Sequence, residues 1–262
     1  MTNNSIEQYS FNDQFSIPRV LTGLWQIADM ERDGQTLDLK IKAEAVKPFV
    51  ESGLNAFDMA DHYGSAEDIL GIYRNKYQAE FPVQAFTKWV PKPGTMTIDT
   101  VRDAVGISLK RLQTDQIDLM QFHAWNYADP AWLEALFLLQ QLKEEGLIKN
   151  LGLTNFDTAH LRIAIKSGID IVSNQVCFSL LDRRAAGQMS DLCIESGVRL
   201  FAFGTLAGGF LSDKWLNQPE PALNENLNWS QMKYKRFIDT AGGWAKYQNL
   251  LQVLNKVAQD KQ

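Results

Sequence analysis

The chain has 262 residues, of which 45% are hydrophobic and 22% charged, an ordinary balance for a globular protein that can bury a sizeable core. Its formal net charge of -5, without any long run of Lys or Arg, argues against a nucleic-acid-binding surface. No apolar stretch approaches the roughly 20 residues that cross a bilayer, and the polar N-terminal residues lack a signal-peptide pattern. We therefore expect a cytoplasmic protein with no membrane or nucleic-acid partner.

The cysteine pattern also favours a cytoplasmic protein. Cys177 lies in a strand-like run and Cys193 in a helical pattern, and the chain has no CxxC spacing. We expect two buried thiols rather than a disulfide or a metal site.

The chain begins with a predicted hairpin and continues as an alternation of strands and helices. Residues 9–11 and 15–17 predict two strands around Asn12 and Asp13, which favour turns. From residue 20 onward short apolar runs alternate with amphipathic helical patterns, which favours parallel strands with right-handed crossovers. The expected strands are 20–24, 54–57, 83–86, 117–122, 148–153, 171–173 and 198–203. The expected helices are 43–51, 66–76, 98–112, 131–145, 158–166, 184–195, 231–240 and 245–258.

Seven such strands suggest an α/β barrel that forms one domain over residues 1–262. Polar residues follow these strands at their carboxyl ends, which is where a βα barrel builds its site. No eighth strand follows residue 203, so two edges would stay unpaired. We expect a (β/α)8 TIM barrel truncated after strand 7, with the strand 8 region beyond Gln262. The alternative is a complete seven-stranded open sheet sealed by its last helices.

Three residues at neighbouring strand ends have chemical meaning as a set. Asp58 follows an apolar run, Tyr63 lies in the loop after it, and Lys88 closes the next run. A phenol with an ordinary pKa of about 10 is a poor proton donor at neutral pH, but a neighbouring ammonium lowers that pKa. Asp58 would keep Lys88 charged and in place. The alternative is that each is an ordinary loop or strand-end residue.

His123 follows the fourth expected strand and is a candidate for the same site, with a structural histidine as the alternative. A metal site built from histidines is disfavoured, because His62, His123 and His160 are the only histidines and form no HxH pair. Asp61 and His62 fit turn residues better than ligands.

These positions resemble the aldo-keto reductases. The resemblance rests on DMADHYG, on Lys88 in FTK, His123 in MQFHAW, Asn155 in GLTNF and Gln175 in NQV, in the same order and at similar spacing, and it covers about residues 20–211. It implies a TIM barrel and a nicotinamide cofactor bound without a Rossmann domain. No GxGxxG opens a helix in this chain, which agrees.

The resemblance also implies the reaction, in which hydride transfer leaves negative charge on a carbonyl oxygen. Tyr63 would donate the proton, Lys88 and Asp58 would tune the phenol, and His123 would hold the oxygen. The expected activity is NADPH-dependent reduction of an aldehyde or ketone, or the reverse. The alternative is a non-catalytic, cofactor-binding regulatory protein on the same fold.

Cofactor contacts are implied by the same resemblance. Thr154, Asn155 and Gln175 would bind the nicotinamide amide, Phe203 would stack on its ring, and the loop after residue 203 would wrap the pyrophosphate. The family commonly has Ser and Pro where this chain has Gly204 and Thr205, and Ser in place of Thr154. NADP is the expected cofactor, with NAD as the alternative. The expected contacts are Gly23, Trp25, Asp58, Thr154, Asn155, Gln175, Phe203, Gly204, Thr205, Leu206 and Gly208.

Aromatic residues cluster at the expected loop starts and favour an apolar or sugar-like substrate pocket. The expected partner is a small carbonyl or alcohol compound, and the sequence leaves the oligomeric state open. The substrate candidates are Trp25, Trp89, His123 and Trp125, with Tyr127 beside them. Trp132 fits helix packing better, and Trp215, Trp229 and Trp244 either cover the site or pack the last helices.

Overall fold

The structure is a computed structural model that describes residues 6–12, 15–124, 126–222 and 227–261. The chain forms two compact units, and each is described by itself. The first unit comprises residues 1–174 with 195–199, and the second comprises residues 175–194 with 200–262. The single domain over residues 1–262 stays a prediction.

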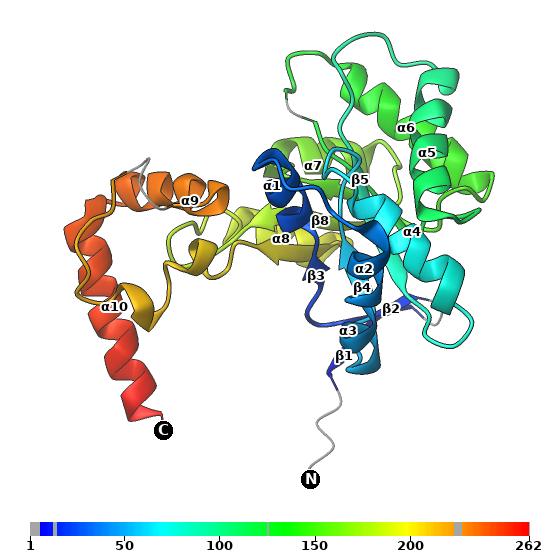
Figure 1. Ribbon diagram of the computed structural model, residues 1–262. Coiled ribbons are helices and arrows are strands. Elements are labelled where there is room, and N and C mark those ends of the chain that lie inside the picture. Colours follow the sequence, from blue (N-terminus) through cyan, green and yellow to red (C-terminus); the bar gives the residue numbers. More distant parts are fainter. Residues whose placement is uncertain (1–5, 13–14, 125, 223–226, 262) are drawn as a thin grey trace. The chain divides into compact units, whose positions relative to one another are not determined.

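Strands and helices alternate along the chain as expected (Figure 1). The strands are β1 (Gln8–Asn12), β2 (Phe15–Pro18), β3 (Thr22–Gly23), β4 (Ala56–Asp58), β5 (Gln84–Trp89), β6 (Leu119–Phe122), β7 (Leu151–Thr154), β8 (Ile171–Cys177) and β9 (Arg199–Phe203). The helices are α1 (Trp25–Arg32), α2 (Leu39–Glu44), α3 (Lys47–Glu51), α4 (Ala66–Tyr77), α5 (Ile98–Leu112), α6 (Ala131–Glu144), α7 (Thr158–Lys166), α8 (Gln188–Ser196), α9 (Trp229–Thr240) and α10 (Gly243–Asp260), with short 3-10 turns η1 (Ala207–Gly209) and η2 (Asp213–Trp215).

The main sheet has seven strands in the part of the chain that the structure describes, and their order from β3 to β9 follows the sequence. The pairs from β3 to β7 are parallel, as the alternation predicted. Their register places Asp58 opposite Gly23 on one side and Phe86 on the other, and it places Lys88 opposite Gln121. Parallel pairing therefore brings Gly23, Asp58 and Lys88 to the same end of their strands.

The N-terminal hairpin is also confirmed, because β1 and β2 pair antiparallel. The Phe15 and Ile17 side chains are buried, and the Phe15 ring lies 5.9 Å from that of Phe86 on β5. Gln84 donates a 2.7 Å hydrogen bond to the Ser16 carbonyl, which adds a polar contact between the hairpin and β5.

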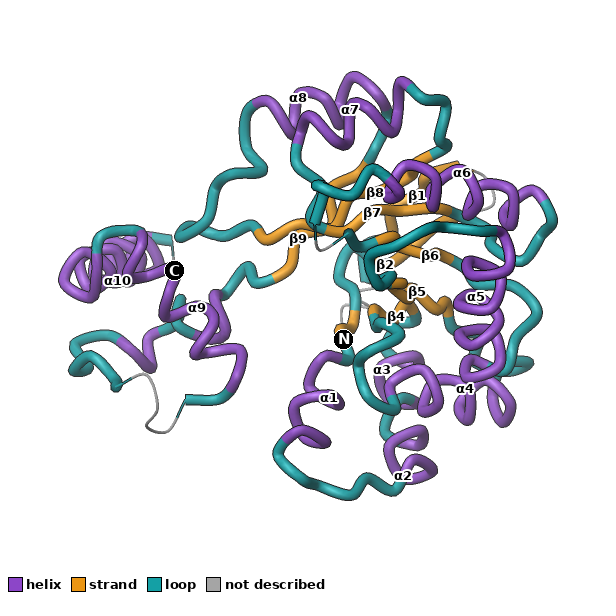
Figure 2. Tube along the Cα trace, turned by 90° about the horizontal axis from the view of Figure 1, so that it is seen from above, coloured by secondary structure: helices purple, strands orange, loops and turns teal. Residues whose placement is uncertain are grey.

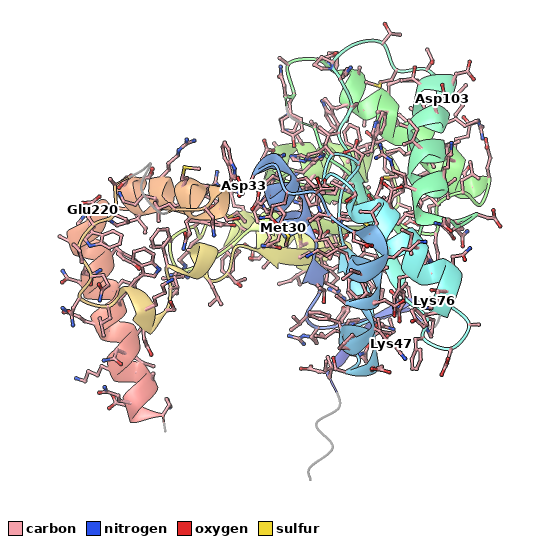
Figure 3. The ribbon with its side chains drawn as sticks, in the orientation of Figure 1. Met30, Asp33, Lys47, Lys76, Asp103 and Glu220 are labelled. Carbon is pink, nitrogen blue, oxygen red and sulfur yellow. The ribbon has the colours of Figure 1, made fainter. Side chains whose placement is uncertain are left out.

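Helices α4, α5 and α6 follow one another beside strands β4 to β7 (Figure 2). All four side chains of β6 are buried, as expected for a parallel strand that is covered on both faces. The short α2 and α3 attach to α4: Lys76 and Tyr77 on α4 both donate to the Glu44 carboxylate, and Lys47 lies 5.4 Å from the Tyr77 ring (Figure 3).

Several predicted elements were wrong in extent: β5 runs three residues beyond the expected strand 83–86, and α8 begins four residues after the start of the expected helix 184–195. Residues 43–51 form two helices rather than one, because Pro48 lies in the first turn of α3 and has no N–H to continue a helix. The expected strand 20–24 is reduced to Thr22–Gly23, and helix α1 begins at Trp25 directly after it. The expected strand 171–173 continues to Cys177, so Gln175 lies inside β8 rather than at its end.

The second unit contains a hydrophobic cluster of its own. Tyr234 and Ile238 of α9 and Tyr247 and Leu251 of α10 pack there with Phe210, which follows η1. The Tyr247 hydroxyl donates a 2.6 Å hydrogen bond to the Phe210 carbonyl. The rings of Trp215 and Trp244 lie 6.0 Å apart, so these two residues pack with the last helices.

Both cysteines are free and buried, as expected. Among the described residues no helix is long and apolar enough to cross a membrane.

Candidate active site

The centre of the site is a buried ion pair between neighbouring strands of the first unit. Lys88 on β5 donates from Nζ to Asp58 Oδ2 at 2.7 Å and to the Met59 carbonyl at 3.0 Å. The Lys88 side chain is 2% exposed and that of Asp58 is 15% exposed. Gln121 on β6, itself fully buried, donates to Asp58 Oδ1 at 2.9 Å. Both carboxylate oxygens are therefore hydrogen-bonded, which fixes the position of the lysine amine.

Burial governs the protonation of this lysine. Removal from water lowers the pKa of Lys88 below its ordinary value, and the nearby carboxylates of Asp58 and Asp61 partly offset the shift. An amine in this state holds its proton less tightly than a surface lysine, yet it keeps an anion in direct contact.

Tyr63 lies in the loop after β4, with its ring beside this amine. The ring centroid is 5.0 Å from Lys88 Nζ. The Trp25 and Tyr63 rings meet edge to face, with centroids 4.8 Å apart. The Tyr63 ring is thus held between a buried cation and an aromatic wall that comes from α1.

Helix α1 binds a second point of the loop that carries Tyr63. This loop, residues 59–65 between β4 and α4, is called the Tyr63 loop below. The Glu31 carboxylate accepts from the Ser65 backbone N–H at 3.0 Å and from the Ser65 hydroxyl. Gly64 has a φ of 55°, and a Cβ there would overlap the Glu31 carboxylate. A glycine is therefore required at this position both by its backbone conformation and by the close approach of α1.

His123 follows β6 directly, and its backbone N–H donates to the Trp89 carbonyl at 3.0 Å. Its Nε2 lies 3.4 Å from the Asn155 side-chain nitrogen. Asn155 adopts a φ of 58°, an uncommon conformation that asparagine tolerates better than most residues. The fourth expected catalytic residue thus meets one of the expected cofactor residues.

Thr154, the last residue of β7, presents a buried polar group. Its side chain is 2% exposed, and among the described residues its hydroxyl has no hydrogen-bond partner. A buried hydroxyl of this kind is costly unless something bonds to it.

The expected pyrophosphate loop lies in the second unit and begins at the end of β9. Gly204 has a φ of 69°, and a Cβ there would overlap the hydroxyl of Tyr234 on α9. The family's usual serine would not fit against this tyrosine. The absence of a side chain at Gly204 is therefore matched by a bulky neighbour, and α9 brings a hydroxyl close to the same part of the loop.

Phe203, the expected stacking ring, has a cation beside it. Lys233 on α9 places Nζ 4.7 Å from the Phe203 ring centroid. Beyond it Leu206 is 63% exposed, and Gly208 has a φ of 64° within η1. Thr205 is exposed, and Gln175 on β8 is buried.

The aromatic substrate candidates occupy different surroundings. Trp89 is 6% exposed and packs edge to face on Phe122, whereas Trp25 is partly exposed. Tyr127 stacks on His160 with centroids 3.8 Å apart, and Trp132 is buried beside them. Gly23 is exposed at the end of β3, and Trp125 lies outside the described residues.

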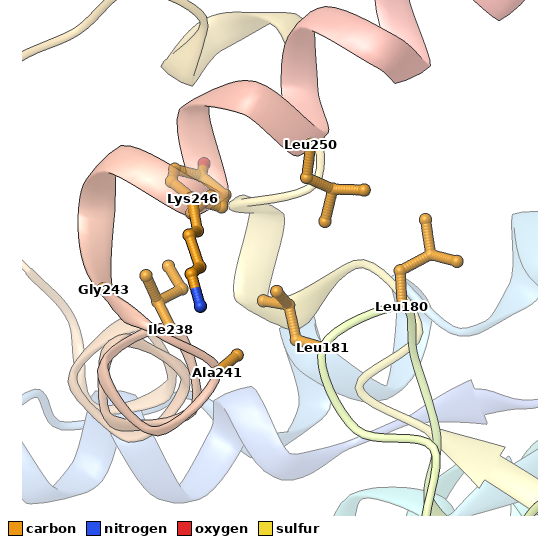
Figure 4. Close-up of a pocket in the computed structure, with 8 residues that line it drawn as sticks. Leu180, Leu181, Ile238, Ala241, Gly243, Lys246 and Leu250 are labelled. Carbon is orange, nitrogen blue, oxygen red and sulfur yellow. The ribbon is translucent and has the colours of Figure 1, made fainter.

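A cavity of about 210 Å³ lies in the second unit, between the segment after β8 and helices α9 and α10 (Figure 4). None of the expected site residues lines it. Leu180, Leu181, Ile238 and Leu250 line it together with Lys246 and Tyr247. Within the described residues no group of three or more His, Cys, Asp or Glu side chains is arranged to hold a metal ion.

Gln121 is a site residue that the sequence analysis missed. It is a polar residue inside the apolar run that forms β6, and that contrast was the available signal. The Met59 carbonyl carried no signal, because any residue offers a carbonyl there.

Residues 19–262 match the family model described as Aldo/keto reductase family. The chain belongs to the aldo/keto reductase family. The resemblance expected from the motifs is thereby confirmed, and the match extends beyond the region those motifs cover.

Known members of the family show how far the likeness reaches. "Aflatoxin B1 aldehyde reductase member 2" of Rattus norvegicus is 32% identical over 219 residues, which are 78% of this chain and 59% of that protein. "NADH-specific methylglyoxal reductase" of Escherichia coli is 27% identical over 261 residues, 89% of this chain and 79% of that protein. The chain therefore spans less than two thirds of the rat relative's length.

A solved aldo/keto reductase from Brucella melitensis superposes with a TM-score of 0.64 at 28% identity, covering 79% of this chain and 75% of that one. The expected fold class, an α/β fold of the aldo/keto reductase barrel type with an N-terminal hairpin, is confirmed.

Proposed function

We propose that this chain is an NADPH-dependent oxidoreductase that reduces an aldehyde or ketone to an alcohol, or catalyses the reverse, with Tyr63 as the proton donor. The observation that carries the proposal is the buried Lys88 amine, which lies 2.7 Å from Asp58 Oδ2 and 5.0 Å from the Tyr63 ring centroid. A cation held this close to a phenol favours its anion and so makes the phenol a stronger acid.

The reaction needs a proton at the carbonyl oxygen as the carbon is reduced. Tyr63 donates that proton. Lys88 stabilises the phenolate that remains, and Asp58 with Gln121 holds the amine in place. His123 hydrogen-bonds the carbonyl oxygen from a second direction and orients the substrate. A reduced nicotinamide, when bound, supplies the hydride.

The residues present fit such a cofactor. The unpartnered hydroxyl of Thr154 and the Asn155 side chain offer hydrogen bonds to a planar amide. Phe203 offers a ring face for stacking, and Gly204, Thr205, Leu206 and Gly208 form the loop for the pyrophosphate. Gly23, Trp25 and Gln175 complete the proposed contacts. NADH is the alternative, because the Escherichia coli relative is named for it.

The substrate proposed is a small carbonyl compound bound against aromatic side chains. Trp25 stands beside Tyr63 at an edge-to-face contact, so it would form one wall. Two relatives are named for reducing aldehydes, an aflatoxin aldehyde and methylglyoxal, and an aldehyde is therefore the first substrate to test.

The test compares wild type with Tyr63→Phe, using 4-nitrobenzaldehyde and either NADPH or NADH and following the loss of the reduced-nicotinamide absorbance. General acid catalysis contributes typically about 10²- to 10⁴-fold, so the variant should lose activity on that scale while still binding the cofactor.

Equal rates for wild type and Tyr63→Phe would overturn the proposed role. Cofactor binding by wild type without turnover of any aldehyde or ketone would instead favour a non-catalytic, cofactor-binding regulatory protein. Fluorescence quenching by NADPH measures that binding independently of turnover.

A further inference from the structure

An ion pair between Glu67 on α4 and Arg111 on α5 connects these two helices to the Tyr63 loop. We call it the Glu67–Arg111 brace. Arg111 on α5 donates from Nη1 to the Glu67 carboxylate on α4 at 3.2 Å and to the Asp61 carbonyl at 2.9 Å. The second Glu67 oxygen accepts from the Thr87 hydroxyl on β5 at 2.6 Å. The brace thus contacts α4, α5, β5 and the loop at once.

The contact points of the brace lie next to the catalytic residues in sequence. Thr87 immediately precedes Lys88. Asp61 lies two residues before Tyr63, and it is itself bound to β5: its backbone N–H donates to the Lys88 carbonyl at 2.9 Å, and its carboxylate accepts from the Val90 N–H at 3.1 Å. A shift of Asp61 relative to β5 would therefore change the position of Tyr63 relative to Lys88.

Burial holds the carboxylate end of the brace, whereas the Arg111 side chain is 36% exposed. The Glu67 side chain is 1% exposed, and a carboxylate taken out of water is stable only while its partners hold it. Gly71 on α4 lets the two helices approach closely, since a Cβ there would overlap the Arg111 carbonyl oxygen. The Arg111 backbone is therefore packed closely against α4, and its guanidinium group is bound by Glu67 and Asp61.

We propose that Arg111 and Glu67 are positioning residues, which set the separation of the Tyr63 phenol from the Lys88 ammonium and thereby the acidity of the phenol. This rests on the proposed function of Tyr63. Proton donation depends steeply on geometry, because a misplacement of about 1 Å can cost about 100-fold in rate.

Position and charge predict Tyr63 pKa shifts of the same sign for Arg111→Gln and of opposite sign for Glu67→Gln, so Glu67→Gln is the variant that separates the two accounts. Loss of the Arg111 cation would by charge alone raise the pKa of Tyr63, and loss of the Glu67 anion would lower it. If the brace acts by position, Arg111→Gln and Glu67→Gln both weaken the hold on Asp61, both move Tyr63 away from the ammonium, and both raise the pKa.

Two measurements follow that pKa. The first is the absorbance of tyrosinate against pH, recorded for each variant and for the same variant carrying Tyr63→Phe, so that the difference isolates one tyrosine without requiring turnover. The second is kcat and KM for aldehyde reduction against pH, where the rate falls as Tyr63 loses its proton.

The matched control is Arg102→Gln. Arg102 lies on the same helix and forms a 2.6 Å ion pair with Glu145, but in this pair the carboxylate is also partly exposed, at 34%, and it stands at the end of α6 rather than on α4. Arg111→Lys is a milder second variant that keeps the charge, and it serves if Arg111→Gln does not fold. Urea unfolding shows which variants are folded.

We expect Arg111→Gln and Glu67→Gln each to raise the Tyr63 pKa by about 0.5 or more and to lower kcat about 10- to 100-fold, with KM for the aldehyde changed much less. Arg111→Lys should recover part of the loss, and Arg102→Gln should match wild type. Shifts of opposite sign, no shift in folded variants, or an equal shift in Arg102→Gln would each overturn the inference. If Tyr63→Phe alone leaves the rate unchanged, the proposed function fails instead.

Discussion

In the described part of the chain each unit buries one lysine, and the two lysines differ in how their charge is balanced. Lys88 in the first unit pairs with one carboxylate, that of Asp58, which Gln121 also binds. Lys235 in the second unit pairs with two, Glu220 at 2.6 Å and Asp239 at 2.5 Å, and its side chain is 4% exposed. Glu220 is labelled in Figure 3.

The difference appears in the protonation of the two amines. Burial lowers the pKa of Lys88 despite its carboxylate partner. Burial acts in the same direction on Lys235, but its bonds to Asp239 and Glu220 outweigh it and raise the pKa of Lys235. Two carboxylates bind the Lys235 amine, so we assign this lysine a structural role. The Lys88 amine has one carboxylate partner, which it shares with Gln121, and its charge can still act on the Tyr63 phenol.

The largest expected effect is that of Lys88→Met. The substitution removes the cation beside Tyr63 and leaves Asp58 partly buried without its partner, so we expect at least about 100-fold lower kcat for aldehyde reduction and a loss of about 3 kcal/mol in the free energy of unfolding. Steady-state kinetics and urea unfolding measure the two losses. Wild-type kcat in a folded Lys88→Met protein would remove the main support for the proposed chemistry.

Lys235→Met should lower the free energy of unfolding while leaving kcat nearly unchanged. The carboxylates left behind, on Glu220 and Asp239, are about half exposed and water can solvate them, so the expected loss is about 1 kcal/mol. The kcat should stay within about twofold of wild type, measured in the same assays. A large loss of turnover with normal stability would show that the two lysines do not divide into a functional and a structural one.

Cys177 extends the comparison to a buried thiol, whose pKa the cations of Lys233 and Arg184 lower less than burial raises it. Burial, with a smaller contribution from the Asp182 carboxylate, raises the pKa of Cys177 to about 11. The folded state therefore keeps its proton where an unfolded thiol loses it, so this contribution to stability is complete below about pH 8.5 and is lost as the pH rises to about 11.

At pH 8 the thiolate fraction of Cys177 should be about 100-fold or more below that of a free cysteine, and alkylation by iodoacetamide correspondingly slow. Peptide mass spectrometry of labelled protein, native and in urea, measures it. Rapid labelling of Cys177 in the native protein at pH 8 would contradict the comparison.

The sequence predicted the elements whose signals are local. Helix α5 was predicted at its observed limits because its apolar spacing is regular, and in the structure Thr97 caps its start by accepting from the Thr100 N–H. The break at Pro48 was also readable but was missed. Helix α1 was not predicted, because it has only eight residues and it is held by Glu31 and Trp25, whose partners lie more than 30 residues away.

The candidate site was predictable where a residue type carries chemistry. Asp58 and Lys88 stand at neighbouring strand ends, and parallel pairing alone brings them together. The Glu67–Arg111 brace was not predictable in the same way, because Arg111 reaches the Asp61 carbonyl across 50 residues and backbone groups carry no sequence signal. The size of Tyr234 could not be connected with Gly204 before α9 was placed.

The contact of Glu31 with Gly64 has a practical consequence for redesign. The Glu31 carboxylate fills the space that a side chain at Gly64 would occupy, and it connects the end of α1 to the Tyr63 loop and the start of α4. Residues 31 and 64 therefore cannot be varied independently. A library aimed at new substrates should therefore keep both positions fixed.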